Sequence, residues 1–176
     1  MAKQEINYLA HLDKVLENLY QPGLLLVTQG KDGKPNPMII GWGTVGIIWG
    51  KPCFVVLVRP SRHSFGLMEE QMEFTVNVLP KERAADAGYC GSNSGRDSDK
   101  LADCGLTAAP AQQVSVPIVK ECVIHYECRV VHHNDLAPDN LSGGLLSACY
   151  PEGDYHRLYY GEIVACYADE DAAERL

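Results

Sequence analysis

The ten residues CVIHYECRVV, at positions 122–131, alternate between two kinds of side chain. In an extended chain one face collects the mostly apolar members, which are Cys122, Ile124, Tyr126, Cys128 and Val130. The opposite face collects the polar members, which are His125, Glu127 and Arg129. A period of two over this length is typical of a strand. The stretch therefore indicates sheet structure.

Short apolar runs on both sides of this stretch extend the pattern. We expect strands at 24–28, 38–40, 54–58, 74–78 and 158–167, with a hairpin turn at Lys31-Asp32-Gly33-Lys34. We expect helices at 8–19 and 64–71, and a short helix that is capped by Asp97 and ends at Gly105. Residues 91–95 are expected to form the most flexible loop. Strands outnumber helices and hairpin spacings dominate. The sequence thus predicts a mainly β fold, an antiparallel barrel with short helices at its rims.

Length and composition set further bounds. The 176 residues suit one domain, 1–176, with a helical segment at 1–22 and an acidic tail at 168–176. The net charge of −8 argues against nucleic acid, which needs a surplus of Lys and Arg. The sequence has no basic amphipathic helix and no long apolar span, so it gives no indication of membrane binding. The polar residues 1–5 do not resemble a signal peptide. Seven cysteines without a CxxC pair are typical of reduced thiols, so we expect a cytoplasmic protein.

The segment Gly41-Trp42-Gly43-Thr44-Val45-Gly46 matches the dinucleotide-binding pattern GxGxxG. That pattern works only between a strand and a helix whose N-terminus holds a pyrophosphate. Here residues 47–52 are β-prone and then broken by proline, so the dinucleotide interpretation is rejected. What remains is a strand with glycines where a flat ligand or another backbone approaches closely.

The segment Arg59-Pro60-Ser61-Arg62-His63-Ser64 gathers two guanidiniums, an imidazole and two hydroxyls in an otherwise acidic chain. Arginine forks at a strand end, followed by a short helix, suit a phosphate monoester. A solvated strand end is the other interpretation, and the cluster alone does not separate the two. The loop 91–95 could form a backbone nest for an anion or a flavin edge, with Lys100 one turn further on, or be an ordinary loop.

Other chemistry finds little support in the sequence. Most cysteines lie in apolar runs and are expected in the core, and Cys90, beside the glycine loop, is expected to be a packed thiol. The pair His132-His133 has no partners at metal-ligand spacing, so we expect no metal. We also expect no catalytic nucleophile, acid or base.

Four motifs, in the same order and spacing, resemble the flavin reductase-like family of FMN-binding split barrels, close to flavoredoxin. They are residues 36–43 (NPMIIGWG), 59–64 (RPSRHS), 74–78 (FTVNV) and 90–100 (CGSNSGRDSDK), and residues 158–164 look like that family's last strand. The resemblance covers residues 6 to about 167.

The resemblance implies a Greek-key split β-barrel that forms a homodimer, with one FMN per subunit at or near the interface. The isoalloxazine is expected along Met38, Ile39, Ile40, Gly41, Trp42, Gly43, Thr44 and Val45. The phosphate is expected among Arg59, Pro60, Ser61, Arg62, His63 and Ser64, with further contacts at Asn77, Val78, Cys90, Gly91, Ser94, Gly95 and Lys100.

The chain departs from the family beside the methionine. The family usually has threonine on each side of it, where this sequence has Pro37 and Ile39. Ile39 cannot donate a hydroxyl hydrogen bond to the flavin. One lost bond costs about 0.5–1.5 kcal/mol, roughly tenfold in affinity.

The resemblance implies that the chemistry belongs to the cofactor, with hydride passing from NAD(P)H to FMN N5 in an FMN reductase. The alternatives are a flavoredoxin-type carrier that keeps FMN and serves a redox partner protein, a redox-silent FMN-binding protein, and an enzyme resembling pyridoxamine-phosphate oxidase. The reductase is the main hypothesis and the carrier ranks next, with NADH and NADPH left as equal candidates for the donor.

Overall fold

The computed structural model describes residues 3–176, so the first two residues of the polar N-terminal stretch lie outside it. The strands are β1 (Lys3–Glu5), β2 (Leu24–Gln29), β3 (Pro35–Ile40), β4 (Gly43–Ile48), β5 (Lys51–Val58), β6 (Glu73–Val78), β7 (Ala108–Ala109), β8 (Ile118–Val119), β9 (Ile124–Asp135) and β10 (Arg157–Asp169). The helices are α1 (Leu12–Tyr20), α2 (His63–Gln71), α3 (Ala84–Ser92), α4 (Lys100–Cys104), α5 (Gly143–Cys149) and α6 (Ala172–Arg175), with 3₁₀ turns η1 (Lys81–Arg83) and η2 (Pro138–Asn140).

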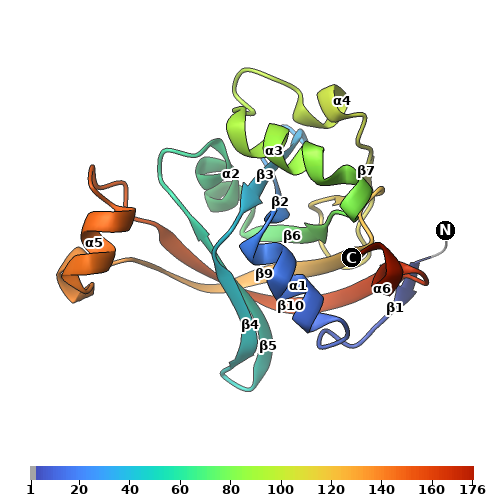
Figure 1. The fold of residues 1–176 in the computed structure, drawn as a ribbon, viewed down its shortest axis with the longest axis horizontal. Helices are drawn as coiled ribbons and strands as arrows, with labels where there is room; N and C mark the ends of the chain where they lie inside the picture. The colour runs from blue at the N-terminus through green and yellow to red at the C-terminus, as the bar shows by residue number, and fades with distance from the viewer. Residues whose placement is uncertain (1–2) are drawn as a thin grey trace.

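The main sheet has the strand order β3-β2-β6-β9-β10-β5-β4, and β1 adds to β10 (Figure 1). Every strand pairing among residues 3–176 is antiparallel. The two edge strands, β3 and β4, are joined by Gly41 and Trp42 but form no ladder with each other in the described residues. This opening makes the barrel a split one, which confirms the predicted fold class.

Two apolar cores lie on either side of the sheet. The larger contains Phe54, Phe74, Tyr126 and Tyr159, all fully buried. The smaller packs Leu25 and Val27 of β2 and other side chains under α3 and the loop that follows α4. Because both faces of β2 and β6 are covered, these strands are almost continuously buried.

The polar face of β9 is buried as well, which its sequence pattern does not show. His125 and Glu127 are both 0% exposed, because the segment 112–119 folds over them. The Glu127 carboxylate accepts hydrogen bonds from the amides of Gln112 and Gln113 and from the Tyr167 hydroxyl. A buried carboxylate needs such donors, so Glu127 holds the covering segment in place.

Several predicted boundaries are wrong. The loop expected at 91–95 begins later, because α3 continues through Ser92. The cap of α4 is Asp99, whose carboxylate accepts from the Ala102 amide, rather than Asp97. The strand expected at 122–131 runs on to Asp135 as β9, so the histidine pair at 132–133 lies inside it. The helix expected at 8–19 begins only at Leu12.

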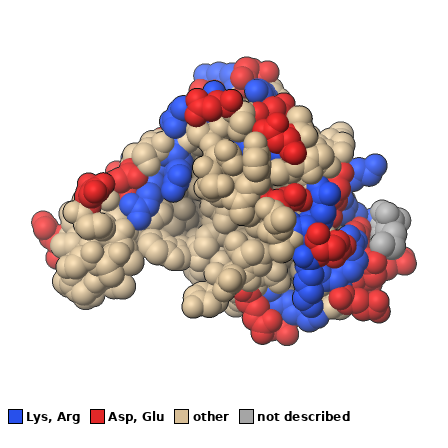
Figure 2. Space-filling view, turned by 45° about the horizontal axis from the view of Figure 1, so that its top comes forward, with Lys and Arg blue, Asp and Glu red and all other residues tan. Residues whose placement is uncertain are grey.

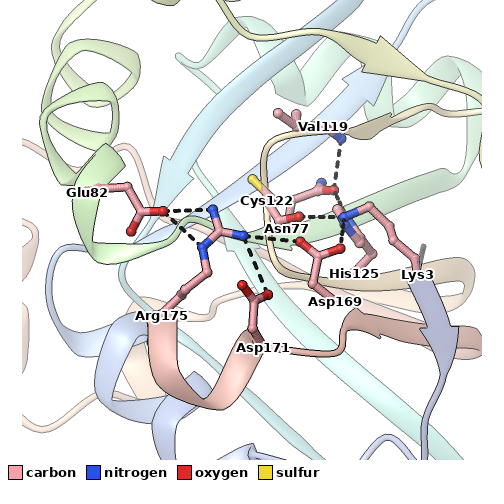
Figure 3. Close-up of polar contacts among 9 residues, drawn as sticks. All are labelled: Lys3, Asn77, Glu82, Val119, Cys122, His125, Asp169, Asp171 and Arg175. Atoms are coloured by element: carbon pink, nitrogen blue, oxygen red, sulfur yellow. Dashed lines mark hydrogen bonds and ion pairs between the residues drawn. The ribbon is translucent and has the colours of Figure 1, made fainter. Parts of the chain in front are cut away.

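The C-terminal residues are tied to the body instead of forming a free tail. Arg175 binds Glu82 and Asp169, and Lys3 binds Asp169 and the Cys122 carbonyl (Figure 3). Leu176 is only 4% exposed and belongs to the larger core. The acidic tail at 168–176 is therefore part of the packed structure.

Residues 136–156 leave the body as an arm between β9 and β10, which carries η2 and α5 (Figure 1). Neither η2 nor α5 contains a buried residue. Charges of both signs crowd one half of the surface seen in Figure 2, whereas the half that includes the arm carries few of them. None of the helices in residues 3–176 has the length and apolar character needed to cross a membrane.

Gly161 lies on β10 beside an irregularity in its pairing with β9, and the core leaves no room there for a side chain. A Cβ at this position would lie 2.4 Å from Phe74 Cζ and 2.7 Å from Cys128 Cβ. We expect Gly161→Ala to lower the free energy of unfolding by about 1–3 kcal/mol, the usual cost of overpacking. Urea denaturation measures it.

Gly88→Ala is the matched control, because open space surrounds that position in helix α3. We expect it to raise stability by about 0.5–1 kcal/mol. Equal stabilities for the two variants would contradict the packing described for β10.

Candidate functional site

Two adjoining hollows open at the split between β3 and β4. The polar hollow, about 170 Å³, is lined by Asn36, Met38, Ile39, Ser61, Arg62, His63, Ser64, Cys90, Ser92, Asn93, Ser94, Gly95, Arg96 and Lys100. The aromatic hollow, about 200 Å³, is lined by Met38, Ile39, Ile40, Gly41, Trp42, Leu57, Arg59, Arg62 and His156. They share Met38, Ile39 and Arg62, so together they form one groove with two chemically different ends.

The polar hollow is built for an anion. Arg62, Arg96 and Lys100 line it, whereas no Asp or Glu among residues 3–176 does, although the chain carries a net charge of −8. Arg62 immediately precedes α2, whose first turn offers unpaired backbone amides. Local positive charge and free amides are the features that bind phosphate groups in proteins.

The cations of this hollow disfavour one another. Burial lowers the pKa of Lys100, which is 3% exposed, and the Arg62 charge lowers it further. Burial likewise lowers the pKa of His63, followed by the charges of Arg96 and Lys100. A bound anion would relieve this repulsion and favour the protonated forms. Lys100 is held in place by its hydrogen bond to the Cys90 carbonyl, at 3.3 Å.

Asn36 links three parts of the polar hollow. Its Nδ2 donates to Ser64 Oγ at 2.8 Å, which ties β3 to α2. Its Oδ1 is buried and has no hydrogen-bond partner among the described residues. Gly95 lies so close that a Cβ there would be 1.8 Å from Asn36 Oδ1. The glycine is therefore required by contact, because the Gly95 backbone lies directly against this buried oxygen.

The aromatic hollow has an apolar floor and an aromatic wall. The floor is the end of β3, and Trp42 lies 5.1 Å from His156 and 6.3 Å from Tyr150, between ring centroids. The Tyr150 hydroxyl and His156 Nδ1 are hydrogen-bonded at 2.7 Å. Burial, followed by the charge of Arg59, lowers the pKa of His156 to about 4. The His156 ring is thus uncharged at neutral pH, and the rings of this wall suit a flat ring system.

Most residues expected to bind a cofactor come together in this groove. Those that line it are Met38, Ile39, Ile40, Gly41, Trp42, Arg59, Ser61, Arg62, His63, Ser64, Cys90, Ser94, Gly95 and Lys100. Arg59, expected near the phosphate, lines the aromatic hollow and does not line the polar hollow. Burial raises the pKa of the Cys90 thiol to about 12, as expected for a packed cysteine.

Seven expected residues lie outside the groove lining, namely Gly43, Thr44, Val45, Pro60, Asn77, Val78 and Gly91. Gly43 serves the sheet, since a Cβ there would lie 2.7 Å from the Val55 carbonyl oxygen. Asn77 is fully buried and its Oδ1 accepts from the Val119 amide and contacts His125 Nδ1 (Figure 3). Its polar atoms are therefore used inside the core.

Six lining residues were not assigned from the sequence: Asn36, Leu57, Ser92, Asn93, Arg96 and His156. Four of them, Asn36, Ser92, Asn93 and Arg96, fall within the motifs quoted for the family resemblance. Neighbouring residues of the same motifs were assigned to the site, and this proximity is the signal that could have indicated them. Leu57 and His156 have no such signal, because only the fold brings β5 and the base of the arm to the groove.

Comparison with known proteins identifies the family. Residues 18–176 match the flavin reductase like domain, so the chain belongs to the flavin reductase-like family. An uncharacterised protein of Archaeoglobus fulgidus is 34% identical over 85% of this chain and 74% of its own length.

Solved structures agree with that assignment. Flavoredoxin of Desulfovibrio vulgaris is 25% identical with a TM-score of 0.68, covering 85% of this chain and 70% of that one. Flavoredoxin of Methanosarcina acetivorans is 26% identical with a TM-score of 0.68, covering 85% and 69%.

The contact between Gly95 and Asn36 can be tested without any ligand. A methyl group on Gly95 would collide with the buried Asn36 amide, so we expect Gly95→Ala to cost about 1–3 kcal/mol of stability. In the double variant Gly95→Ala/Asn36→Ala the collision is removed. The two substitutions should then cost less together than the sum of the single effects, as measured by denaturation in a double-mutant cycle.

Gly66→Ala, in open space on α2, is the control and should be neutral or stabilising. Additive single effects, with no coupling between positions 95 and 36, would contradict the close approach.

Proposed function

We propose that this chain binds FMN in the groove and acts as an NAD(P)H-dependent flavin reductase. The observation that carries the proposal is the pairing of a carboxylate-free cationic end with an aromatic end through shared residues. FMN has the same division, with a phosphate dianion at one end and a flat ring at the other. Membership of the flavin reductase-like family supports this ligand over other phosphorylated aromatics.

The residues present fit the three parts of FMN. Arg62, Lys100 and Arg96 would hold the phosphate together with the hydroxyls of Ser64 and Ser94. Asn36 would orient the Ser64 hydroxyl beside the ribityl chain through its hydrogen bond. The ring would lie along the floor of the aromatic hollow. Alternate amides on the open edge of β3 are available to it, whereas Ile39 offers no side-chain hydrogen bond.

When bound, FMN would supply the redox chemistry by accepting hydride from a nicotinamide nucleotide. The residues of the chain bind and orient. Trp42 and His156 form one wall and restrict the ring to the groove, and the side chains of Met38 and Ile40 exclude water from its floor. His156 stays uncharged at neutral pH because of its lowered pKa, so the positive charge that lines this hollow is that of Arg59 and Arg62, which would favour electron arrival at the ring. No side chain need act as acid or base.

A flavoredoxin-type electron carrier is the second candidate. The likeness to two flavoredoxins, at 25% and 26% identity, favours it. In that role the chain would keep its FMN and exchange electrons with a redox partner protein, without reducing free flavin.

We also propose that the active form is a homodimer. At the tip of the β4–β5 hairpin, Ile47 and Trp49 are 61% and 64% exposed. Val131 of β9 is 43% exposed, and Leu145 of the arm is 54% exposed. These large apolar side chains have little cover in one chain, and β4 is an open sheet edge. A second copy of the chain presents the same apolar face and can cover it symmetrically.

Spectroscopy tests the function. The purified protein with FMN should show the bands of bound oxidised flavin, roughly at 375 and 450 nm, and NADH or NADPH should bleach them in the absence of oxygen. Catalytic reduction of excess FMN would establish the reductase, whereas bleaching of one bound equivalent without turnover would establish the carrier. A colourless protein whose melting temperature does not respond to FMN would contradict both.

Sedimentation equilibrium tests the homodimer. We expect a species of twice the chain mass of 19.4 kDa, and Trp49→Glu should shift it to the monomer because a charge is placed in the apolar contact. Tyr89→Glu is the control, since Tyr89 is 37% exposed on α3, which lies at the opposite end of the molecule from the β4–β5 hairpin (Figure 1). A wild-type mass of one chain at micromolar concentration would contradict the proposal.

A further inference from the structure

Arg59 is committed to the base of the arm. Its Nη2 donates to the Cys149 carbonyl at 2.9 Å, and its Nη1 donates to the carbonyls of Asp154 at 3.1 Å and Gly153 at 3.5 Å. The guanidinium also lies 5.0 Å from the centroid of the Tyr150 ring. These hydrogen bonds use both terminal nitrogens, Nη1 and Nη2, of the Arg59 guanidinium.

A second set of bonds joins the same two segments. The Ser61 amide donates to Asp154 Oδ1 at 3.2 Å, and the Ser61 hydroxyl donates to Asp154 Oδ2 at 2.6 Å. Gly153 and Asp154 have φ values of +79° and +55°, and in this conformation both carbonyls accept from Arg59. Left-handed backbone is uncommon at a residue other than glycine, so the tight turn at Asp154 depends on the bonds that hold it.

The rest of the arm supplies little packing to fix its base. Neither α5 nor η2 contains a buried residue, so these elements add little packing around Tyr150. His156 adjoins β10, whose Arg157 pairs with Val58 of β5, and its carbonyl accepts from the Leu136 amide. The bonds to Arg59 and Ser61 tie the other part of the wall, residues 149–154 with Tyr150, to the end of β5. The Ser61 carbonyl also accepts from Arg96 Nη1 at 3.1 Å, which ties the wall to the polar hollow.

We propose that Arg59 and Asp154 form a clamp that positions the Tyr150–His156 wall against Trp42, so that Arg59 is a positioning residue for the flavin ring and not a phosphate ligand. The inference rests on the proposed function for the identity of the ring. Arg62, which lies where the two hollows meet, is the arginine of this segment that serves the phosphate. The two arginines, three residues apart, therefore act on opposite ends of one ligand.

Trp42 gives a readout of the wall that needs no ligand. The chain has two tryptophans, so Trp42 is the only one in a Trp49→Phe background. Its ring contacts His156, and its emission should report displacement of that side chain. In this background we compare Arg59→Ala, Arg59→Lys, Asp154→Gly and Arg62→Ala. Asp154→Gly removes the carboxylate while tolerating positive φ.

We expect Arg59→Ala and Asp154→Gly to change the Trp42 emission and to weaken FMN and riboflavin by the same factor, about tenfold. Arg59→Lys should resemble Arg59→Ala, because one ammonium group keeps the charge but cannot reproduce the fork. Arg62→Ala should leave the emission unchanged and weaken FMN much more than riboflavin. The control Arg129→Ala, which removes an arginine bound to Glu73 far from the groove, should change neither.

Unchanged Trp42 emission in Arg59→Ala, with a loss confined to FMN, would overturn the clamp and make Arg59 a phosphate ligand. Full function in Arg59→Lys would do the same. If the parent protein bound neither flavin, the proposed function would fail, while the emission of the unliganded variants would still decide whether the clamp holds the wall.

Discussion

The missing ladder between β3 and β4 is the constraint on which the site depends. These two edge strands are consecutive and joined by only Gly41 and Trp42, yet they diverge and pair with β2 and β5 instead. The divergence leaves the end of β3 with one open side, and both hollows lie against it. A closed barrel would bury the same residues and leave no groove. The rest of the fold, including the doubly covered strands β2 and β6, keeps the two edges apart.

Electrostatics divides the groove into its two ends. An acidic chain would repel a phosphate dianion in general, so the absence of carboxylates from the polar hollow is decisive for anion binding. Lys100 is buried, and its hydrogen bond to the Cys90 carbonyl holds it in position without a ligand. Burial lowers the pKa of its amino group. At the aromatic end, burial keeps the His156 ring uncharged at neutral pH. A ligand with one anionic end and one flat end is thereby oriented as well as bound.

Much of the fold was predictable because its cause is local. Alternation over 122–131 and the apolar run 54–58 gave correct strands, and motifs confined to short stretches indicated most of the groove. The predicted site residues and the groove lining differ where distant segments meet. Asn77 looks free on an isolated strand, but the segment 112–119 covers it and uses its amide. His156 carries no local signal, because it reaches the groove only through the return of the arm.

Arg59 shows the same limit most clearly. In the sequence it is equivalent to Arg62, and both suit a phosphate. Only the turn at 153–154, almost a hundred residues further on, supplies the carbonyls that engage its donors. Local composition therefore indicates which chemistry is present, while the tertiary fold assigns each side chain to a partner.

A crystal structure of the protein grown with FMN tests the central claim most directly. The account predicts the phosphate in the polar hollow, within about 2.7–3.2 Å of donors on Arg62, Lys100 or Ser64. It also predicts the ring between the end of β3 and the Trp42–His156 wall, with Arg59 still bound to the turn at 153–154. FMN in the reverse orientation, or bound elsewhere on the chain, would contradict it.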